Sequence, residues 1–421
     1  MNQVKSSGNL ENQWQFSESL HSIDSLSNQR VNKNNLLHKI GSIALASAAV
    51  LGLLAYSTND LEHRDVALVA EVVVSDVNTA VNEIIGAHPG SNNININNFI
   101  SRFRLNNGLF KNSDLGWYAS VWPSSMALEA LYTTALLDNK QTYYADFNNS
   151  FKAINQNYWN NVVADHSGYD QGIAAFHSSN NPPLIDDNLW MGLINMGAYN
   201  KTKNPQDIQR AKSIFNLATS QWDHKKGGVY WMVQLESADN HIRAVVSNAS
   251  LVSLGVELYL DSHQIYYLHK SEQIYNWLNK VLLDPVNGLY NDHITKFGYV
   301  DPIKYTYVQG IMIGAMLSLN KVNPTQYPLN KPIELAEKAM KYFAWHKSYG
   351  DPAFDAIWSQ NLLRLASQYN DPSFTKKAKR SVAMAIQASP KSPRGLLYAA
   401  GDLELQDLSH LPFAKYSRLF R

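Results

Sequence analysis

The 421-residue sequence predicts an all-α fold in which alternating inner and outer helices form an (α/α)6 toroid. Three observations lead to this fold class. After residue 98, apolar residues recur at the three- and four-residue spacings typical of amphipathic helices. The most apolar of these segments return at intervals of roughly 60 residues. The segments between them are more amphipathic, as expected for helices that cover an inner ring.

The inner helices are the apolar set, which is also rich in Gly and aromatic residues. The first follows Pro123-Ser124-Ser125, a strong start signal for a helix. The inner helices are expected at Ser124–Leu137, Asp187–Tyr199, Ser247–Leu260, Tyr305–Leu319 and about Ala353–Gln368, so their starts are 63, 60, 58 and 48 residues apart. The outer helices are expected at about Gln206–Ser220, Lys270–Leu282, Lys331–Phe343 and Phe374–Gln387.

A helical solenoid would also repeat paired helices, so the period alone does not exclude one. The unit length favours the toroid, because about 60 residues per pair exceeds the roughly 34 to 47 residues of common solenoid repeats. The additional residues fall in loops such as Asn161–Pro183 and Asp223–Arg243. Long loops at one end of a ring are where binding and catalytic residues are usually found.

The N-terminal region predicts a membrane segment. Residues 1–39 are polar and rich in Asn, Ser and Gln, a composition that indicates a disordered tail. The uncharged stretch Ile40–Tyr56 follows His38 and Lys39, and this predicts an anchor whose N-terminus is cytoplasmic. A cleaved signal peptide is the main alternative, although 39 residues are long for its charged part. A buried helix is the third interpretation of this stretch.

These patterns divide the chain into five parts. After the tail and the anchor at 40–56, residues 57–97 are expected to form a helical stalk and linker. The (α/α)6 domain is then expected at 98–390, followed by a basic C-terminal tail at 391–421. We therefore expect a membrane-anchored protein with this domain outside the cytoplasm, or an exported one.

Composition excludes several classes of function. Lys and Arg number 36 against 35 Asp and Glu, so no net field favours nucleic acid as a partner. The absence of cysteine excludes disulfides, thiolate metal sites and a Cys nucleophile. The 13 His show no convincing ligand spacing, and no glycine-rich phosphate loop is present. We expect no metal and no cofactor, and a monomer.

Two adjacent carboxylates, Asp186 and Asp187, stand at a predicted helix start with Trp190 on the next turn. Helix capping needs only one acid. Glycoside hydrolysis needs two, about 5 to 5.5 Å apart for a retaining mechanism and wider for inversion. Neighbouring residues have Cα atoms about 3.8 Å apart and diverge by about 100° on a helix, so their carboxylates fit the shorter separation.

From about Asn98 to Gln387 the sequence resembles glycoside hydrolase family 76, the α-1,6-mannanases. The resemblance rests on five motifs that occur in the family's order. They are Val121-Trp122-Pro123 with Met126-Ala127-Leu128-Glu129-Ala130-Leu131, Asp186-Asp187-Asn188-Leu189-Trp190, Gly227-Gly228-Val229-Tyr230-Trp231, Ser247-Asn248 and Tyr305-Thr306-Tyr307-Val308-Gln309-Gly310.

The resemblance implies a retaining glycosidase acting on α-1,6-linked mannan or a related α-mannoside, with Asp186 as nucleophile and Asp187 as acid/base. Transglycosylation, or a toroid that binds carbohydrate without catalysis, are the alternatives. Two departures bear on substrate preference: Val308 replaces an Asn of the family motif, and Asp355-Ala356 replaces a Lys-Gly pair.

Further residues are candidates for substrate binding. The aromatic candidates for stacking on sugar rings, which could equally be core residues, are Trp122, Trp190, Trp231 and Tyr307. The candidates for polar contacts to sugar hydroxyls are Asn248, Asp292 and Gln309.

Overall fold

A computed structural model describes residues 95–419, apart from 114–115, 164–165, 175–181, 234–240, 347 and 391–394. The polar tail, the anchor at 40–56 and most of the stalk therefore lie outside the described residues. Among the helices that are described, none is long and apolar enough to cross a bilayer.

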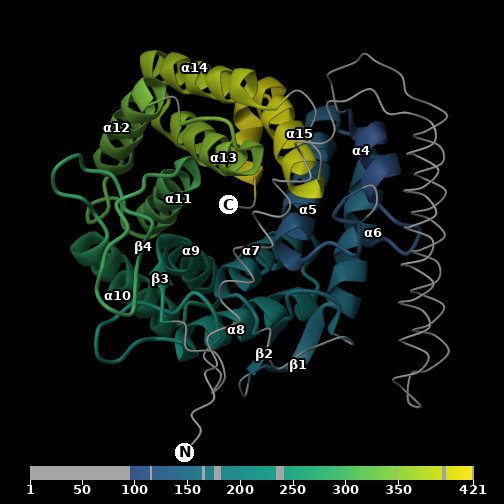
Figure 1. The fold of residues 1–421 in the computed structure, drawn as a ribbon, viewed down its shortest axis with the longest axis horizontal. Helices are drawn as coiled ribbons and strands as arrows, with labels where there is room; N and C mark the ends of the chain where they lie inside the picture. Colours follow the sequence, from purple (N-terminus) through teal and green to yellow (C-terminus); the bar gives the residue numbers. More distant parts are fainter. Residues whose placement is uncertain are drawn as a thin grey trace, which may run out of the picture. The chain divides into compact units, whose positions relative to one another are not determined.

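Six helices form the inner ring of the described domain (Figure 1). They are α5 (Val121–Asp138), α7 (Ile185–Thr202), α9 (Val245–Ser262), α11 (Thr306–Val322), α13 (Pro352–Tyr369) and α15 (Leu396–His410). Most of their residues are buried on every side, because each inner helix packs between two inner neighbours and an outer helix. This explains why the sequence of these helices is apolar all round.

The outer helices lie around this ring (Figure 1). They are α4 (Ile96–Phe103), α6 (Gln141–Asn157), α8 (Pro205–Ser220), α10 (Ile265–Val281), α12 (Asn330–His346) and α14 (Pro372–Ala388). Each of the nine inner and outer helices that the sequence predicts after residue 98 is present, with bounds that differ by at most five residues. The domain was expected from residue 98, but α4 already begins at Ile96, because the Asn95 side chain accepts from the Asn98 N–H at 3.0 Å and caps the helix.

The prediction of a basic C-terminal tail was wrong. Residues 396–410 form α15, whose sequence contains acidic residues and no Lys or Arg. This helix packs against both α13 and α5 and closes the ring. The side chains of Thr133 and Thr134 donate hydrogen bonds to Glu404 and Asp407 across the closure. A closed ring is a toroid, so the open solenoid is excluded for this domain.

Glycines allow the inner helices α11 and α13 to approach closely. A Cβ atom on Gly310 would lie 2.7 Å from the Cα of Trp358, and one on Gly314 would lie 2.6 Å from Asn361 Oδ1. Both distances are shorter than side-chain packing allows, and the first contact is with backbone that cannot rotate away. Gly310 and Gly314 therefore form a helix-packing surface.

Short strands lie in the connections that lead from outer to inner helices. β1 (Trp159–Val163) pairs antiparallel with β2 (His166–Tyr169), with Trp159 opposite Tyr169. β3 (Arg243–Ala244) pairs antiparallel with β4 (His293–Ile294), with Ala244 opposite His293. All of these connections reach the N-terminal ends of inner helices, so they gather at one end of the ring.

An amide side chain at the fourth position of three inner helices fixes these connections. Asn188 accepts from the Tyr169 N–H at 2.7 Å and donates to the Tyr169 carbonyl at 2.9 Å. Asn248 makes the same pair of bonds to Val229, at 2.8 and 3.1 Å. Gln309 does so to Tyr290, at 2.9 and 2.8 Å. The backbone partner is 19 residues earlier each time, so the same hydrogen-bonding arrangement occurs at three places around the ring.

Candidate active site

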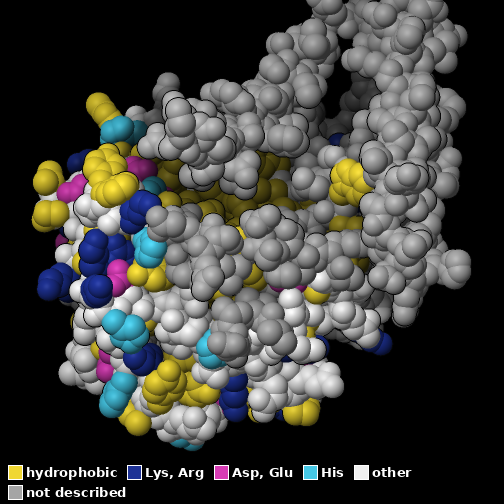
Figure 2. Space-filling model, turned by 60° about the horizontal axis from the view of Figure 1, so that its bottom comes forward, with side chains coloured by type: hydrophobic (Ala, Val, Ile, Leu, Met, Phe, Trp, Pro, Cys, Tyr) yellow, Lys and Arg dark blue, Asp and Glu magenta, His cyan; other side chains and the backbone are white. Residues whose placement is uncertain are grey.

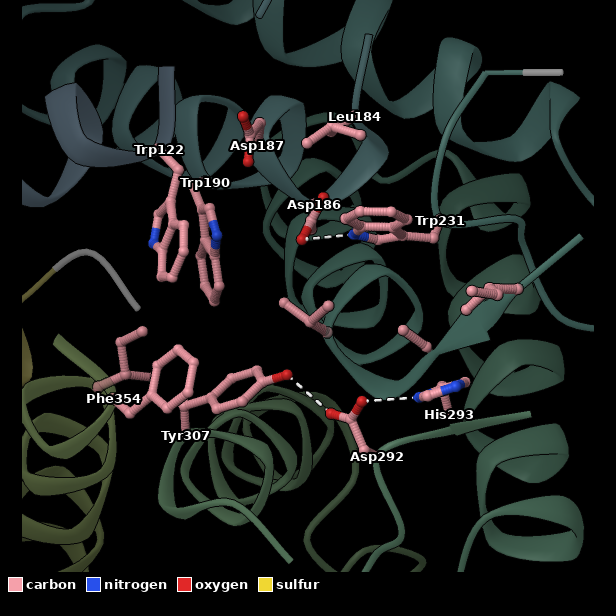
Figure 3. A pocket seen from close by; sticks show the side chains of 14 residues that line it. Trp122, Leu184, Asp186, Asp187, Trp190, Trp231, Asp292, His293, Tyr307 and Phe354 are labelled. Carbon is pink, nitrogen blue, oxygen red and sulfur yellow. Dashed lines mark hydrogen bonds and ion pairs between the residues drawn. The ribbon is translucent and has the colours of Figure 1, made fainter. Parts of the chain in front are cut away.

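A cavity of about 300 Å³ opens among the N-terminal ends of the inner helices (Figure 3). Its walls come from α5, α7, α9, α11 and α13 and from the connections that precede them. The lining residues are Trp122, Leu184, Asp186, Asp187, Trp190, Trp231, Ile242, Ala244, Val246, Asp292, His293, Tyr307, Phe354 and Ile357. The cavity thus combines apolar and aromatic walls with three carboxylates, at a volume in the lower range of small-molecule sites.

Asp186 and Asp187 occupy the first turn of α7. The helix begins at Ile185 and the residue at its N-cap is Leu184, which makes no side-chain cap. Neither acid is therefore the capping residue. Asp187 is only 5% exposed, and Asp186 Oδ1 is buried without a hydrogen-bond partner among the described residues. A buried carboxylate oxygen that lacks a donor is costly, and a ligand hydroxyl can relieve the cost.

Trp231 is the described partner of Asp186. Its indole Nε1 donates to Asp186 Oδ2 at 2.9 Å (Figure 3). Backbone hydrogen bonds hold Trp231 in this place, because its carbonyl accepts from the Ile185 N–H and its N–H donates to the Ile242 carbonyl, both at 2.8 Å. The Gly-Gly-aromatic loop is thereby tied to the first turn of α7.

The two carboxyl groups differ in their protonation. Burial raises the pKa of Asp186 to about 6, and the hydrogen bond from Trp231 opposes that rise. Burial raises the pKa of Asp187 well above its usual value, and the neighbouring charge of Asp186 raises it further. Asp187, whose pKa is raised further than that of Asp186, therefore keeps its proton to a higher pH than Asp186 does. This is the division that a nucleophile and a general acid require.

Aromatic rings form the wall beside the pair (Figure 3). Trp122 stacks on Phe354, with ring centroids 5.9 Å apart and an angle of 21° between the planes. Phe354 also contacts Tyr307 at a centroid distance of 4.3 Å. Trp190 lies beside Trp122 in Figure 3 and is 3% exposed. Flat apolar walls of this kind fit the faces of sugar rings.

A polar group lies across the cavity from Asp186 (Figure 3). The Tyr307 hydroxyl donates to Asp292 Oδ1 at 2.7 Å, and His293 Nδ1 lies 2.8 Å from Asp292 Oδ2. The hydrogen bond with Asp292 raises the pKa of His293. Burial raises the pKa of Tyr307 well above its usual range, and the charge of Asp292 adds to this. Asp292 is thus held in place by two partners and faces the ligand space.

The structure brings together most of the residues selected from the sequence. Asp186, Asp187, Trp122, Trp190, Trp231, Asp292 and Tyr307 all line the cavity. Asn248 and Gln309 do not, since both are buried and fix backbone loops. Val308 is fully buried and does not line the cavity, so this departure from the family motif alters the core instead of the site.

The sequence did not identify His293 or Phe354 as site residues. His293 directly follows Asp292, and Phe354 lies at the start of the last predicted inner helix, directly before the departing pair Asp355-Ala356. In the sequence, their positions at or just before the starts of inner helices were the signal that could have placed them in the site. Within the described ranges, no group of three or more His, Asp or Glu side chains could hold a metal ion.

Comparisons with known proteins agree with this geometry. The sequence profile described as glycosyl hydrolase family 76 matches residues 95–395. Mannan endo-1,6-alpha-mannosidase DFG5 of Saccharomyces cerevisiae is 27% identical over 172 residues, which is 38% of this chain and 37% of that relative. The chain thus spans well under half the length of that curated relative.

Solved structures share the fold. A family 76 mannosidase from Bacteroides thetaiotaomicron superposes with a TM-score of 0.63 at 20% identity, covering 74% of this chain and 95% of the other. An α-1,6-mannanase of Salegentibacter, inactivated at two adjacent aspartates and bound to α-1,6-mannotriose, gives 0.60 at 17% identity, covering 74% and 96%. Since the family profile spans most of the described domain, the chain belongs to glycosyl hydrolase family 76.

Proposed function

We propose that this glycoside hydrolase cleaves α-1,6-linked mannan, or a related α-mannoside, with retention of configuration. The observation that carries the proposal is the adjacent pair Asp186 and Asp187 in one cavity, with the pKa of Asp187 raised well above its usual value and that of Asp186 only to about 6.

The first step joins the sugar to the enzyme. A carboxylate oxygen of Asp186 attacks the anomeric carbon, while the bond from that carbon to the glycosidic oxygen breaks. Asp187 gives its proton to the departing oxygen, so the leaving sugar departs as a neutral alcohol. The product is a glycosyl ester on Asp186 and an ionised Asp187.

The second step releases the sugar. Asp187 removes a proton from water, and the water oxygen attacks the anomeric carbon as the ester bond to Asp186 breaks. Two inversions restore the α configuration, and both carboxyl groups return to their starting states. Trp231 stabilises the Asp186 carboxylate before attack and after release through its 2.9 Å hydrogen bond.

The surrounding residues have corresponding roles in this proposal. Trp122 and Trp190 provide apolar surface for a sugar ring, and Asp292 accepts a hydrogen bond from a sugar hydroxyl. Two relatives support the choice of substrate. One is named a mannan endo-1,6-alpha-mannosidase, and the other is a mannanase solved with α-1,6-mannotriose after replacement of two adjacent aspartates.

Proton NMR of the first-formed product from α-1,6-mannan tests the stereochemistry. We expect the α anomer before mutarotation, and a slow fluorosugar should label a peptide that contains Asp186. If the β anomer formed first, a carboxylate across the cavity would have to act as the base. Asp292 lies there, and the pairing of Asp186 with Asp187 would then be rejected.

We also propose that residues 40–56 hold the catalytic domain outside the cytoplasm. The support is the uncharged 17-residue stretch Ile40–Tyr56 after the cationic Lys39. Fractionation of cells expressing the full chain should place it in the membrane, with the domain accessible to added protease. A soluble exported chain beginning near Ser57 would indicate cleavage instead.

A further inference from the structure

β4 and the residues that follow it form a tight hairpin at residues 293–301, in the connection that leads to α11. The Thr295 N–H donates to the Tyr299 carbonyl at 2.9 Å, and the Asp301 N–H donates to the His293 carbonyl at 2.9 Å. Gly298 turns the chain with φ at +88°, a conformation that favours glycine. The hairpin therefore has a defined base and a defined tip.

The base belongs to the wall of the cavity, because His293 lines it and pairs with Ala244 of β3. Arg243, which is 1% exposed, holds the hairpin from below. Its guanidinium donates to the Thr295 carbonyl at 3.3 Å and to Asp223 Oδ2 at 3.2 Å. The hairpin is thus tied both to the cavity and to the neighbouring connection.

The tip presents two aromatic side chains to solvent. Phe297 is 87% exposed and Tyr299 is 62% exposed. Of the described Phe, Tyr and Trp side chains, only two others are more than half exposed, Trp117 at 57% and Trp345 at 82%. Trp117, Phe297 and Tyr299 lie in connections that lead to inner helices, and Trp345 lies in the last turn of the outer helix α12, so all four are at the end of the ring that holds the cavity. Exposed aromatic residues gathered at one end of a protein indicate a binding surface.

We infer that Phe297 and Tyr299 form a distal subsite that stacks on sugar units of the glycan beyond the catalytic cavity. The inference rests on the proposed function, since it requires a polymeric substrate. A cavity of about 300 Å³ leaves the rest of a long chain outside. Phe297 is four positions after His293, so the tip lies at most about 14 Å from the cavity wall, a distance that a few sugar units span.

An anionic membrane surface is the other partner that an exposed aromatic tip could bind, because lysines lie near it. Hydrophobic and basic side chains do stand side by side at one edge of the face in Figure 2. However, Lys226 Nζ donates to the Lys296 carbonyl at 3.0 Å, and Lys296 Nζ lies 5.4 Å from the centre of the Phe297 ring. Both cations make contacts within the protein, whereas the base of the hairpin is continuous with the cavity, so the glycan is favoured.

The test compares Phe297→Ala/Tyr299→Ala with Tyr266→Ala as a matched control. Tyr266 is 47% exposed but lies at the start of α10, at the opposite end of the ring. On long α-1,6-mannan, we expect the double variant to lose about tenfold in kcat/KM, which corresponds to about 1.4 kcal/mol shared between the two ring contacts. The loss should appear as a higher KM. On α-1,6-mannobiose, which is too short to fill the cavity and reach the tip, the loss should be less than twofold.

Binding gives a separate measure that does not require turnover. In the Asp187→Asn background, the chain with the wild-type hairpin should migrate more slowly through gels that contain mannan than through gels without it. The chain that also carries Phe297→Ala and Tyr299→Ala should be slowed much less. Equal losses on long and short substrates, or no loss on either, would refute the distal subsite. So would unchanged mannan kinetics combined with lost binding to phosphatidylserine vesicles. A wild-type chain that binds mannan through the hairpin but cleaves no α-mannoside would refute the proposed function alone.

Discussion

The hydrogen bond from Trp231 to Asp186 can be tested through the pH dependence of catalysis. Trp231→Phe keeps an aromatic ring in the cavity wall but removes the Nε1 donor, which lies 2.9 Å from Asp186 Oδ2. The donor favours the ionised carboxylate. Its loss should therefore raise the pKa of Asp186 above the present value of about 6.

The size of the shift follows from the strength of the bond. A hydrogen bond to a charged group contributes about 1.5–3 kcal/mol, and one pKa unit corresponds to about 1.4 kcal/mol, so the pKa should rise by about 1–2 units. At pH 6, about half of the wild-type chains hold an ionised Asp186. In the variant this fraction falls to between about one tenth and one hundredth, so kcat/KM at pH 6 should fall about 5- to 50-fold.

The assay is release of reducing ends from α-1,6-mannan between pH 4 and pH 9. The ascending limb of kcat/KM should move to higher pH, and most of the activity should return near pH 8. Trp122→Phe is the matched control, because Trp122 also lines the cavity but its Nε1 has no partner among the described residues. An ascending limb that stays in place in Trp231→Phe, or moves equally in the control, would refute the role of the hydrogen bond.

Three further predictions follow from the site and the fold. Asp187→Asn should lower kcat by about 10²- to 10⁴-fold with an unchanged circular dichroism spectrum, and Asp186→Asn should do at least as much; near wild-type turnover in either variant would contradict the assigned roles. Asn248→Ala should lower the free energy of unfolding by about 3 kcal/mol in urea melts, because it removes three hydrogen bonds to the Val229 and Ala244 backbone, while the KM of the folded enzyme stays the same. Burial raises the folded-state pKa of Asp407 to about 6 from 3.8, so the folded chain binds the extra proton and its stability falls as pH rises through this window. Asp407→Asn should flatten that fall in melts from pH 4 to 7, and an equally steep fall would show that another group is responsible.

The sequence predicted the helices that have strong apolar periodicity and start signals. It did not predict α15, because Lys and Arg residues flank this helix and the helix itself carries the acidic residues Asp402, Glu404 and Asp407. Its Leu and Ala residues were compatible with a buried helix, and so were Tyr398 and Gly401. What identifies α15 is the space between α13 and α5, and only the closed ring shows that this space must be filled.

For a similar reason, the sequence predicted some residues of the candidate site correctly and others not. Asp186 and Asp187 are adjacent in sequence, so their proximity could be predicted without knowledge of the fold. Asn248 and Gln309 stand in motifs that resemble the family's, but a motif does not distinguish a side chain that binds substrate from one that holds a loop. The common 19-residue interval to their backbone partners was present in the sequence, yet it has meaning only once the loops are seen. Phe354 meets Trp122 across more than 200 residues of chain, and no local pattern indicates that contact.

The closure of the ring by α15 has a consequence for how the protein is made. The hydrogen bonds from Thr133 and Thr134 to Glu404 and Asp407 join residues 271 and 273 positions apart. During synthesis α5 leaves the ribosome long before α15, so α5 lacks one of its two inner neighbours until nearly the whole chain has been made. The cavity wall that joins Trp122 of α5 to Phe354 of α13 completes late for the same reason. A nascent chain that stops before residue 396 would therefore expose the apolar flank of α5 to chaperones and proteases, and enzymatic activity would appear only after α15 has been made.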